Sequence, residues 1–205
     1  HGLQHMLTTV DYAGCSGIRN VEWDAVELPS QFMENWCYHR STLLSMGKHY
    51  QTGEPLPDHY YDKLVAAKNF MSGSAMLRQI HFSWVDIALH HEYVAGNGRT
   101  ANDLRLDIAK NTTVVPPIPE DRFLCSFGHI FAGGYSAGYY SYKWAEVLSA
   151  DAYAAFEEAA TPETGVLNPQ VGRLYRQAIL EAGGSDNWIW FHIPDRKSVR
   201  VGKEC

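Results

Sequence analysis

The sequence of 205 residues lacks a long hydrophobic run and an excess of positive charge. No stretch approaches the roughly 18 consecutive apolar residues of a membrane-spanning helix, so we expect no membrane partner. Lys and Arg number 17 against 23 Asp and Glu, and the net charge is -6. Nucleic-acid binding usually needs a basic surface, so this balance predicts no nucleic-acid partner.

Cysteine is scarce as well. The four cysteines are scattered, with no Cys-Xaa-Xaa-Cys pair, which argues against both a disulfide framework and a thiolate zinc site. No charged-then-apolar signal segment opens the chain. We therefore expect a soluble protein with reduced thiols, located in the cytoplasm.

The apolar spacing along the chain is mostly near 3.6 residues, which predicts a mainly α fold with little or no β structure. Helices are expected at about 1–10, 25–46, 58–93, 100–110 and 168–182, and in the region from Trp144 to Phe156. The helical region at 58–93 is expected to be broken near 72–74. Short strand material is expected only at 17–23 and 113–115. No linker of useful length divides the chain, so residues 1–194 are expected to be one structural unit or part of one.

The long helical region at 58–93 carries an apolar stripe. Its members are Leu77, Ile80, Trp84 and Ile87. Such a stripe at helical spacing is typical of a core-facing surface. We therefore predict that these four side chains are buried.

Histidines at positions 1 and 5 would share one face of a helix and could bind one metal ion. The metalloprotease version of this pattern needs a glutamate directly after the first histidine, and that position is Gly2. Taken alone, such a pair is more often two surface or capping histidines. Glu27 and Glu34, seven residues apart, also share a helical face, so one could bind a metal while the other supports a ligand. Solvated helix carboxylates are the alternative.

Three separated segments resemble the thimet oligopeptidase family of zinc metallopeptidases. They are His1–Thr8, Val21–Trp36 and Phe127–Glu146. Within the family, Asp24–Trp36 resembles the oligopeptidases more than the dipeptidyl carboxypeptidases. The resemblance implies the C-terminal part of a multi-helix, zincin-like catalytic domain, whose partner is the N-terminal remainder of the parent enzyme.

The resemblance also implies a zinc site. In this family a His-Glu-Xaa-Xaa-His helix supplies two zinc ligands and the general base, and a later glutamate supplies the third ligand. His1 matches the second histidine, Glu27 matches the later glutamate, and His5 matches a histidine that is not a ligand. The first histidine and the base are expected before residue 1. We therefore expect this chain alone to be inactive and to bind zinc poorly, because it cannot complete the site.

The glycine- and tyrosine-rich segment is implied to face the substrate. His129, Tyr135 and Tyr142 match family residues that bind the peptide or stabilise the oxyanion. Phenolic hydroxyls stay protonated at neutral pH and can donate hydrogen bonds to that charge. Three further residues are expected to contact the peptide, namely Gly133, Gly134 and Tyr139. A glycine-kinked helix start with aromatic core packing is the alternative.

The implied activity is zinc-assisted hydrolysis of internal peptide bonds in short peptides. A dipeptidyl carboxypeptidase of the same family and a non-catalytic helical binding module are the alternatives. The enzyme hypothesis requires His1 and Glu27 to converge on one point, with the Tyr135–Tyr142 segment facing it across a cleft. The basic stretch at 195–205 has no apolar periodicity, and we expect it to be a non-native or disordered tail, with translated adapter sequence as one origin.

Overall fold

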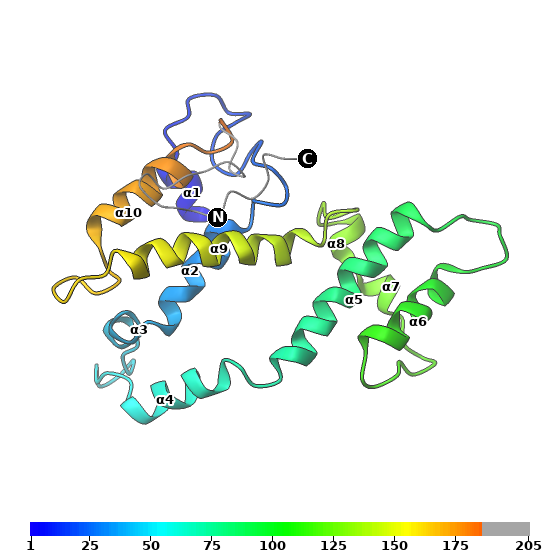
Figure 1. Cartoon of the computed structure of the whole chain (residues 1–205), viewed down its shortest axis with the longest axis horizontal. Coiled ribbons are helices and arrows are strands. Elements are labelled where there is room, and N and C mark those ends of the chain that lie inside the picture. The colour runs from blue at the N-terminus through cyan, green and yellow to red at the C-terminus, as the bar shows by residue number, and fades with distance from the viewer. Residues whose placement is uncertain (186–205) are drawn as a thin grey trace. The chain divides into compact units, whose positions relative to one another are not determined.

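The computed structural model describes residues 1–185, and their regular secondary structure is almost entirely helical, with long loops between the helices (Figure 1). The elements are α1 (Gly2–Leu7), α2 (Leu28–Tyr38), α3 (Arg40–Met46), α4 (Asp58–Ala67), α5 (Ser72–His91), α6 (Ala101–Thr112), α7 (Phe123–Ser126), α8 (Gly128–Phe131), α9 (Ser141–Glu158), α10 (Pro169–Tyr175) and the π-helix η1 (Arg176–Glu181). Within this range the only β pairings are two isolated bridges, Lys48 with Pro55 and Thr161 with Gly165. The predicted mainly α fold is confirmed. The predicted tail at 195–205 lies outside the described residues.

Two predicted helices are each divided in two. The helix expected at 25–46 is interrupted at His39, whose backbone is extended, and forms α2 and α3. The region expected at 58–93 forms α4 and α5, with the break at 68–71 instead of 72–74. Met71 adopts a left-handed backbone with φ 52°, which L-residues adopt only singly and which ends the helical path.

The predicted strand material is wrong at both places. Residues 17–21 form turns, with positive φ at Gly17 and Asn20. Residues 113–115 form a loop in which Val114 and Val115 are 79% and 80% exposed. A strand needs a neighbour to satisfy its backbone groups, and neither segment forms a β bridge within residues 1–185.

The described chain divides into two compact units. Unit 1 combines residues 1–46 with the chain from Trp144 onward, and unit 2 comprises Gly47–Lys143. No helix within residues 1–185 has both the length and the apolar character that crossing a bilayer requires.

The core of unit 1 is rich in aromatic residues. Phe32 of α2 is 2% exposed and stacks on Tyr175 of α10, with 4.1 Å between the ring centroids. Phe156 lies near the end of α9, and its ring centroid is 5.3 Å from that of Phe32. Figure 1 shows α9 as a long helix. The helices predicted from Trp144 to Phe156 and at 168–182 are confirmed, the first as α9 and the second as α10 followed by η1. Helix α10 begins where Asn168 accepts hydrogen bonds from two helical N–H groups.

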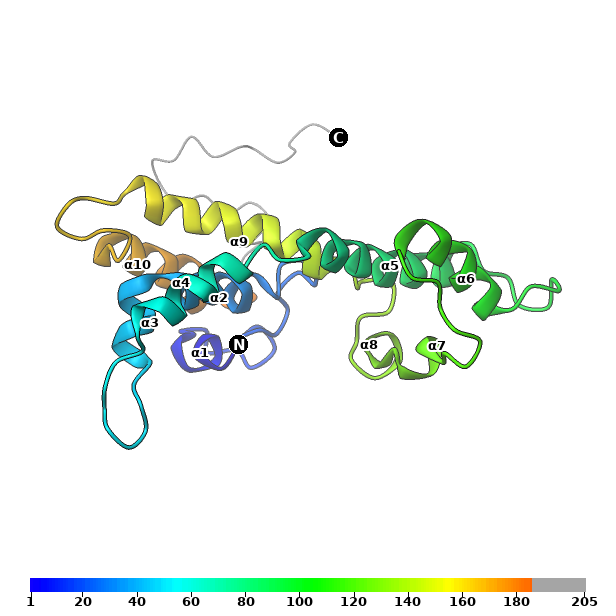
Figure 2. The ribbon, with the colours of Figure 1, turned by 90° about the horizontal axis from the view of Figure 1, so that it is seen from below.

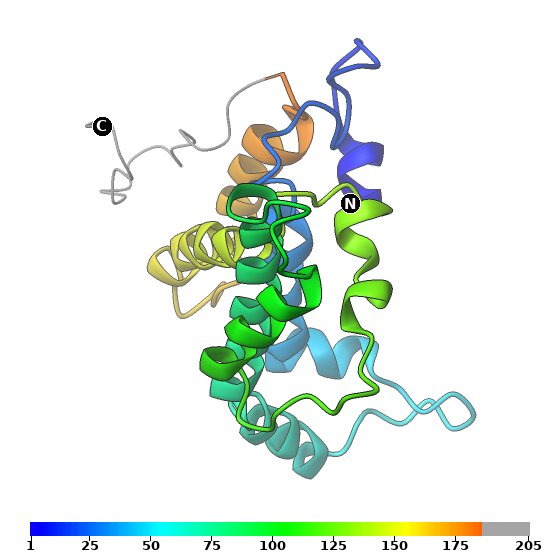
Figure 3. The same ribbon diagram turned by 90° about the vertical axis from the view of Figure 1, so that its right-hand side faces the viewer.

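Unit 2 is built around α5 and α6, which pack against each other (Figure 1). Their shared core consists of Val85, Ala88, Leu104 and Ile108. The helices α7 and α8 follow as two short turns, one after the other (Figure 2). The loop before α4 extends as a hairpin-shaped segment closed by the bridge between Lys48 and Pro55 (Figure 3).

The predicted core stripe of α5 is wrong. Ile80, Trp84 and Ile87 are 39%, 43% and 36% exposed. The buried residues of α5 are instead His81, Val85, Asp86 and Ala88. Val85 and Ala88 pack against α6, and His81 contacts Thr112 of the same helix. Asp86 instead binds the backbone of Ala137 and Tyr139.

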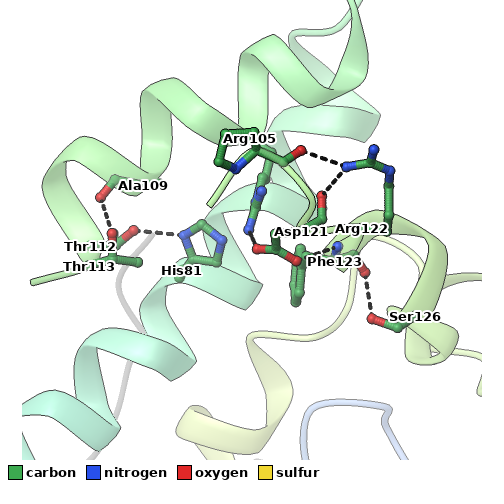
Figure 4. A network of polar contacts seen from close by, with 10 residues as sticks. His81, Arg105, Ala109, Thr112, Thr113, Asp121, Arg122, Phe123 and Ser126 are labelled. Carbon is green, nitrogen blue, oxygen red and sulfur yellow. Dashed lines mark hydrogen bonds and ion pairs between the residues drawn. The ribbon is translucent and has the colours of Figure 1, made fainter. Parts of the chain in front are cut away.

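Polar contacts connect α5, α6 and the segment before α7 (Figure 4). The Nδ1 atom of buried His81 lies 2.7 Å from the Thr112 hydroxyl, and burial, followed by the positive charge of Arg105, lowers the pKa of this imidazole. Arg105 forms an ion pair with Asp121, and its hydrogen bond lowers the pKa of that carboxyl. Asp121 in turn accepts the Phe123 N–H at 2.9 Å, so the network sets where α7 begins.

Candidate active site

His1 and Glu27 come together in unit 1. The His1 Nε2 atom lies 3.0 Å from the Glu27 Oε2 atom, although the two residues are 26 positions apart in sequence. The His1 side chain is 38% exposed and the Glu27 side chain 12% exposed. An imidazole nitrogen and a carboxylate oxygen thus converge at a partly open position, as the zinc hypothesis requires of this pair.

The Glu27 carboxylate is oriented by its place at the start of α2. Glu27 is the N-cap residue, and Pro29 occupies the first turn, where a missing N–H costs nothing. The Ser30 hydroxyl lies 2.7 Å from Glu27 Oε2 and 2.9 Å from the Glu27 carbonyl oxygen, and these two acceptors share its single hydrogen. Ser30 therefore restricts the rotation of the side chain that His1 meets.

His5 does not join this pair. Its ring lies so close to Gly17 that an added Cβ there would come within 2.0 Å of Nδ1. Gly17 has φ +66° and no side chain, so it accepts this contact without strain. The neighbouring Gln4 is fully buried and donates to the Gly17 carbonyl at 3.0 Å. These contacts hold α1 against the loop and engage His5 away from His1.

Glu34 lies on the exposed face of α2, two turns after Glu27. Across residues 1–185, no group of three or more His, Cys, Asp or Glu side chains is arranged to hold a metal ion. The whole sequence contains no His-Glu-Xaa-Xaa-His. The chain therefore contributes a pair of candidate ligands, His1 and Glu27.

In unit 2, His129, Tyr135, Tyr139 and Tyr142 form a ring cluster. The Tyr135 and Tyr142 rings stack at 4.6 Å between centroids, with an interplanar angle of 20°. The His129 ring lies 5.6, 5.2 and 5.8 Å from the rings of Tyr135, Tyr139 and Tyr142. Tyr135 and Tyr139 also belong to a buried core with Phe127 and Ile130. The cluster thus combines the predicted site residues with the aromatic packing that was the alternative.

Tyr139 is the most deeply packed tyrosine of the cluster at 5% exposed. Its hydroxyl lies 3.0 Å from Gln79 Oε1 and donates to it. Burial, followed by the neighbouring Tyr142, raises the pKa of this phenol, so it stays protonated at neutral pH. Its proton is engaged by Gln79, whereas the His129 residue as a whole is exposed.

Gly133 and Gly134 permit the turn between α8 and this cluster. A Cβ on Gly133 would lie 3.1 Å from the His129 Cα, so a side chain there would crowd the backbone. Gly134 has φ 80°, which favours glycine. The Tyr135 N–H then donates to the His129 carbonyl at 2.8 Å. The glycines thus bring the histidine and the first tyrosine together.

Sequence reasoning missed Gln4, Ser30 and Asp86. Ser30 stands three residues after Glu27 at a helix start, which is the position of a capping partner and was a detectable signal. Asp86 is a single carboxylate in an otherwise apolar part of α5, which also could have indicated a buried anion. Gln4 had no comparable signal.

The sequence of this chain is similar to those of a known protein family. The model of peptidase family M3 matches residues 1–189. A protein of Arabidopsis thaliana named "Probable cytosolic oligopeptidase A" is 59% identical over 184 residues, which is 90% of this chain and 26% of that protein. The oligopeptidase A of Escherichia coli is 49% identical over 186 residues, covering 91% of this chain and 27% of the relative.

The dipeptidyl carboxypeptidase of E. coli is more distant, at 34% identity over 189 residues, or 91% of this chain and 27% of that protein. The chain spans about a quarter of the length of these curated relatives. The match over nearly all of the chain, together with its helical fold, establishes that it belongs to peptidase family M3.

Proposed function

We propose that this chain forms part of the active site of a zinc oligopeptidase that hydrolyses internal bonds of short peptides. In this proposal His1 and Glu27 are zinc ligands, and His129, Tyr135 and Tyr142 bind the peptide and stabilise the oxyanion. The observation that carries it is the 3.0 Å contact between His1 Nε2 and Glu27 Oε2. The family membership supports the general activity.

The chemistry of the two donors suits zinc. Imidazole nitrogen and carboxylate oxygen are ligands that zinc takes in proteins, so His1 and Glu27, whose Nε2 and Oε2 atoms lie 3.0 Å apart, are the residues of this chain that would hold it. When bound, zinc would polarise the scissile carbonyl and lower the pKa of a water to about 7. Ser30 keeps the Glu27 carboxylate in place by donating its hydroxyl proton to Oε2. Such supporting hydrogen bonds orient metal ligands.

The aromatic residues of unit 2 supply hydrogen-bond donors. The hydroxyls of Tyr135 and Tyr142 are neutral donors at physiological pH, and exposed His129 can donate from its ring. Donors held in place in advance stabilise the negative charge that develops on a carbonyl oxygen during attack. Gly133 and Gly134 leave the backbone open for a peptide to approach closely. Tyr139 belongs to the same ring cluster, with its hydroxyl bonded to Gln79.

The proposed substrate specificity is that of an oligopeptidase. The higher identity to oligopeptidase A, 49% against 34% for the dipeptidyl carboxypeptidase of the same organism, supports cleavage of internal bonds. A cytoplasmic location is also proposed, supported by a relative named as cytosolic and by the free thiols of Cys15, Cys37 and Cys125. A fluorescent fusion of the parent protein tests the location.

A chimaera tests the proposed ligands. Residues 1–185 replace the matching segment of the E. coli oligopeptidase A, which supplies the rest of the enzyme. We expect Glu27→Gln or His1→Ala to lower peptidase activity and zinc content by more than about 100-fold, because each removes a ligand. Glu34→Gln, on the exposed face of the same helix, is the control and should change neither quantity.

Full zinc content in the Glu27→Gln chimaera would reject the ligand assignment and leave the helical binding module as the better hypothesis.

A peptide blocked at its C-terminus distinguishes an oligopeptidase from a dipeptidyl carboxypeptidase. A dipeptidyl carboxypeptidase needs a free C-terminus, so cleavage of the blocked peptide supports the oligopeptidase. The 205-residue chain alone should show no zinc-dependent hydrolysis, because it contains no His-Glu-Xaa-Xaa-His.

A further inference from the structure

Helix α5 contains a fully buried carboxylate that the proposed mechanism does not use. Asp86 is 0% exposed. Its Oδ1 atom accepts the Ala137 N–H at 2.9 Å, and its Oδ2 atom accepts the Tyr139 N–H at 2.9 Å. These donors are 51 and 53 positions further along the chain. One side chain therefore binds, at two points, the backbone of the loop between α8 and α9, residues 132–140, which we call the tyrosine loop.

His90, one turn later on α5, is the third partner of Asp86. Its Nδ1 atom lies 3.1 Å from Asp86 Oδ1 and 2.7 Å from the Asp86 carbonyl oxygen. Both oxygens are acceptors, so Nδ1 must carry a hydrogen. Burying a carboxylate is costly unless hydrogen bonds replace its water. The two backbone N–H groups and this imidazole provide that replacement.

The loop adopts a conformation that its own contacts only partly explain. Its internal hydrogen bonds use the N–H groups of Tyr135 and Gly138. Ala137 has φ 54°, a left-handed backbone conformation that is sterically unfavourable for a residue with a Cβ atom. The N–H groups that Asp86 accepts belong to this strained residue and to Tyr139, two positions later. Asp86 thus satisfies the donors that the turn leaves open.

We propose that Asp86 is a positioning residue for the peptide-binding tyrosines. It acts through the loop: the Ala137 bond lies two residues after Tyr135, and the Tyr139 bond lies three residues before Tyr142. With the loop held at both points, the Tyr135 ring stacks on Tyr142 at 4.6 Å and the His129 ring packs against Tyr139 at 5.2 Å. This inference rests on the proposed function for its effect on catalysis, but its structural part does not.

The near-isosteric substitution Asp86→Asn tests the role. An amide has a single acceptor oxygen, and its NH2 group would face a second N–H donor without forming a hydrogen bond. We expect at least one of the two loop bonds to be lost while the shape of the helix is kept. Asp62→Asn is the matched control, because Asp62 is an exposed aspartate on α4 of the same unit.

The first readout uses the full 205-residue chain and no substrate. In the unsubstituted chain, NMR should detect scalar couplings across the hydrogen bonds from the Ala137 and Tyr139 amides to the Asp86 carboxyl carbon. In Asp86→Asn, amide hydrogen exchange at Ala137 and Tyr139 should accelerate about 10-fold or more, while exchange at Val85 and Ile108 stays unchanged. Absence of the couplings, or unchanged loop exchange, would overturn the proposal.

The second readout uses the chimaera described above. Asp86→Asn should lower kcat/KM about 10-fold or more with zinc content unchanged, whereas Glu27→Gln should lose zinc. Unchanged kcat/KM in Asp86→Asn rejects the positioning role. So does loss of the helical circular dichroism signal, because a positioning residue leaves the rest of the unit folded. If Glu27→Gln retains zinc while amide exchange at Ala137 and Tyr139 accelerates in Asp86→Asn, the proposed function fails, but the role of Asp86 in holding the loop stands.

Discussion

The two sets of candidate site residues are held by different forces. In unit 1, His1 and Glu27 meet through polar contacts at a partly open position, and the packed core is made of other side chains such as Phe32 and Tyr175. In unit 2, Tyr135 and Tyr139 are themselves members of the buried core. We therefore expect a substitution of His1 or Glu27 to impair the proposed zinc binding without loss of stability, whereas a substitution of Tyr135 or Tyr139 should affect both stability and the proposed peptide binding.

The core of unit 1 gives the largest expected effect. Phe32→Ala should lower the free energy of unfolding by about 3–5 kcal/mol, because Phe32 is 2% exposed and packs against several rings. Urea denaturation of the 205-residue chain measures this. Met33→Ala, at a side chain that is 42% exposed, and His1→Ala should each change stability by less than about 0.5 kcal/mol. A comparable loss in His1→Ala would contradict the separation of ligands from core.

Removal of the hydroxyl that supports Glu27 sharpens the same contrast. Ser30→Ala in the chimaera should weaken zinc affinity about 10–100-fold, because the carboxylate loses its orienting donor. The affinity is measured by competition with a chelator of known zinc affinity. The thermal midpoint of the metal-free protein should change little. Ser45→Ala, at an exposed serine of α3, is the control. Unchanged zinc affinity in Ser30→Ala would show that Glu27 needs no such support.

In unit 2, removal of a side-chain hydroxyl should reduce stability. Tyr139→Phe removes a buried hydroxyl and leaves Gln79 Oε1 without that donor, so the free energy of unfolding should fall by about 1 kcal/mol. Urea denaturation provides the measurement. Tyr140→Phe, at the exposed neighbour, should have a smaller effect. Equal effects of the two substitutions would mean that burial of the cluster does not distinguish its tyrosines.

The smallest effect concerns pH. Burial, followed by Arg105, lowers the pKa of His81, so below about pH 6.5 the unfolded chain binds more protons than the folded chain at this residue. Stability should therefore fall as the pH drops from about 7.5 to about 5.5, and His81→Asn should make this fall shallower. The exposed His59→Asn is the control. Equal slopes for His81→Asn and the unsubstituted chain would count against the effect.

Local signals in the sequence predicted much of the helical structure. The helix beginning after Thr100 has a capping box in which Thr100 and Asp103 bond each other's backbone, and such a motif depends on neighbours only. The face of α5 was predicted wrongly because an apolar stripe does not reveal which stripe a partner helix will cover. His81 and Asp86 entered the core because Thr112 and the loop backbone supplied their hydrogen bonds.

The candidate site was also predicted only in part by local signals. The resemblance of three segments was enough to name His1, Glu27 and the residues from His129 to Tyr142. No pattern in the residues alone would have paired two positions that are 26 apart.

The sequence by itself determined the mainly α fold and the family, because both depend on residue types at short spacing. Only the tertiary structure decided that His1 meets Glu27 and that Asp86 holds the tyrosine loop. Contacts between distant segments depend on how the helices pack, and the energy of a buried charge depends on the donors that this packing brings to it.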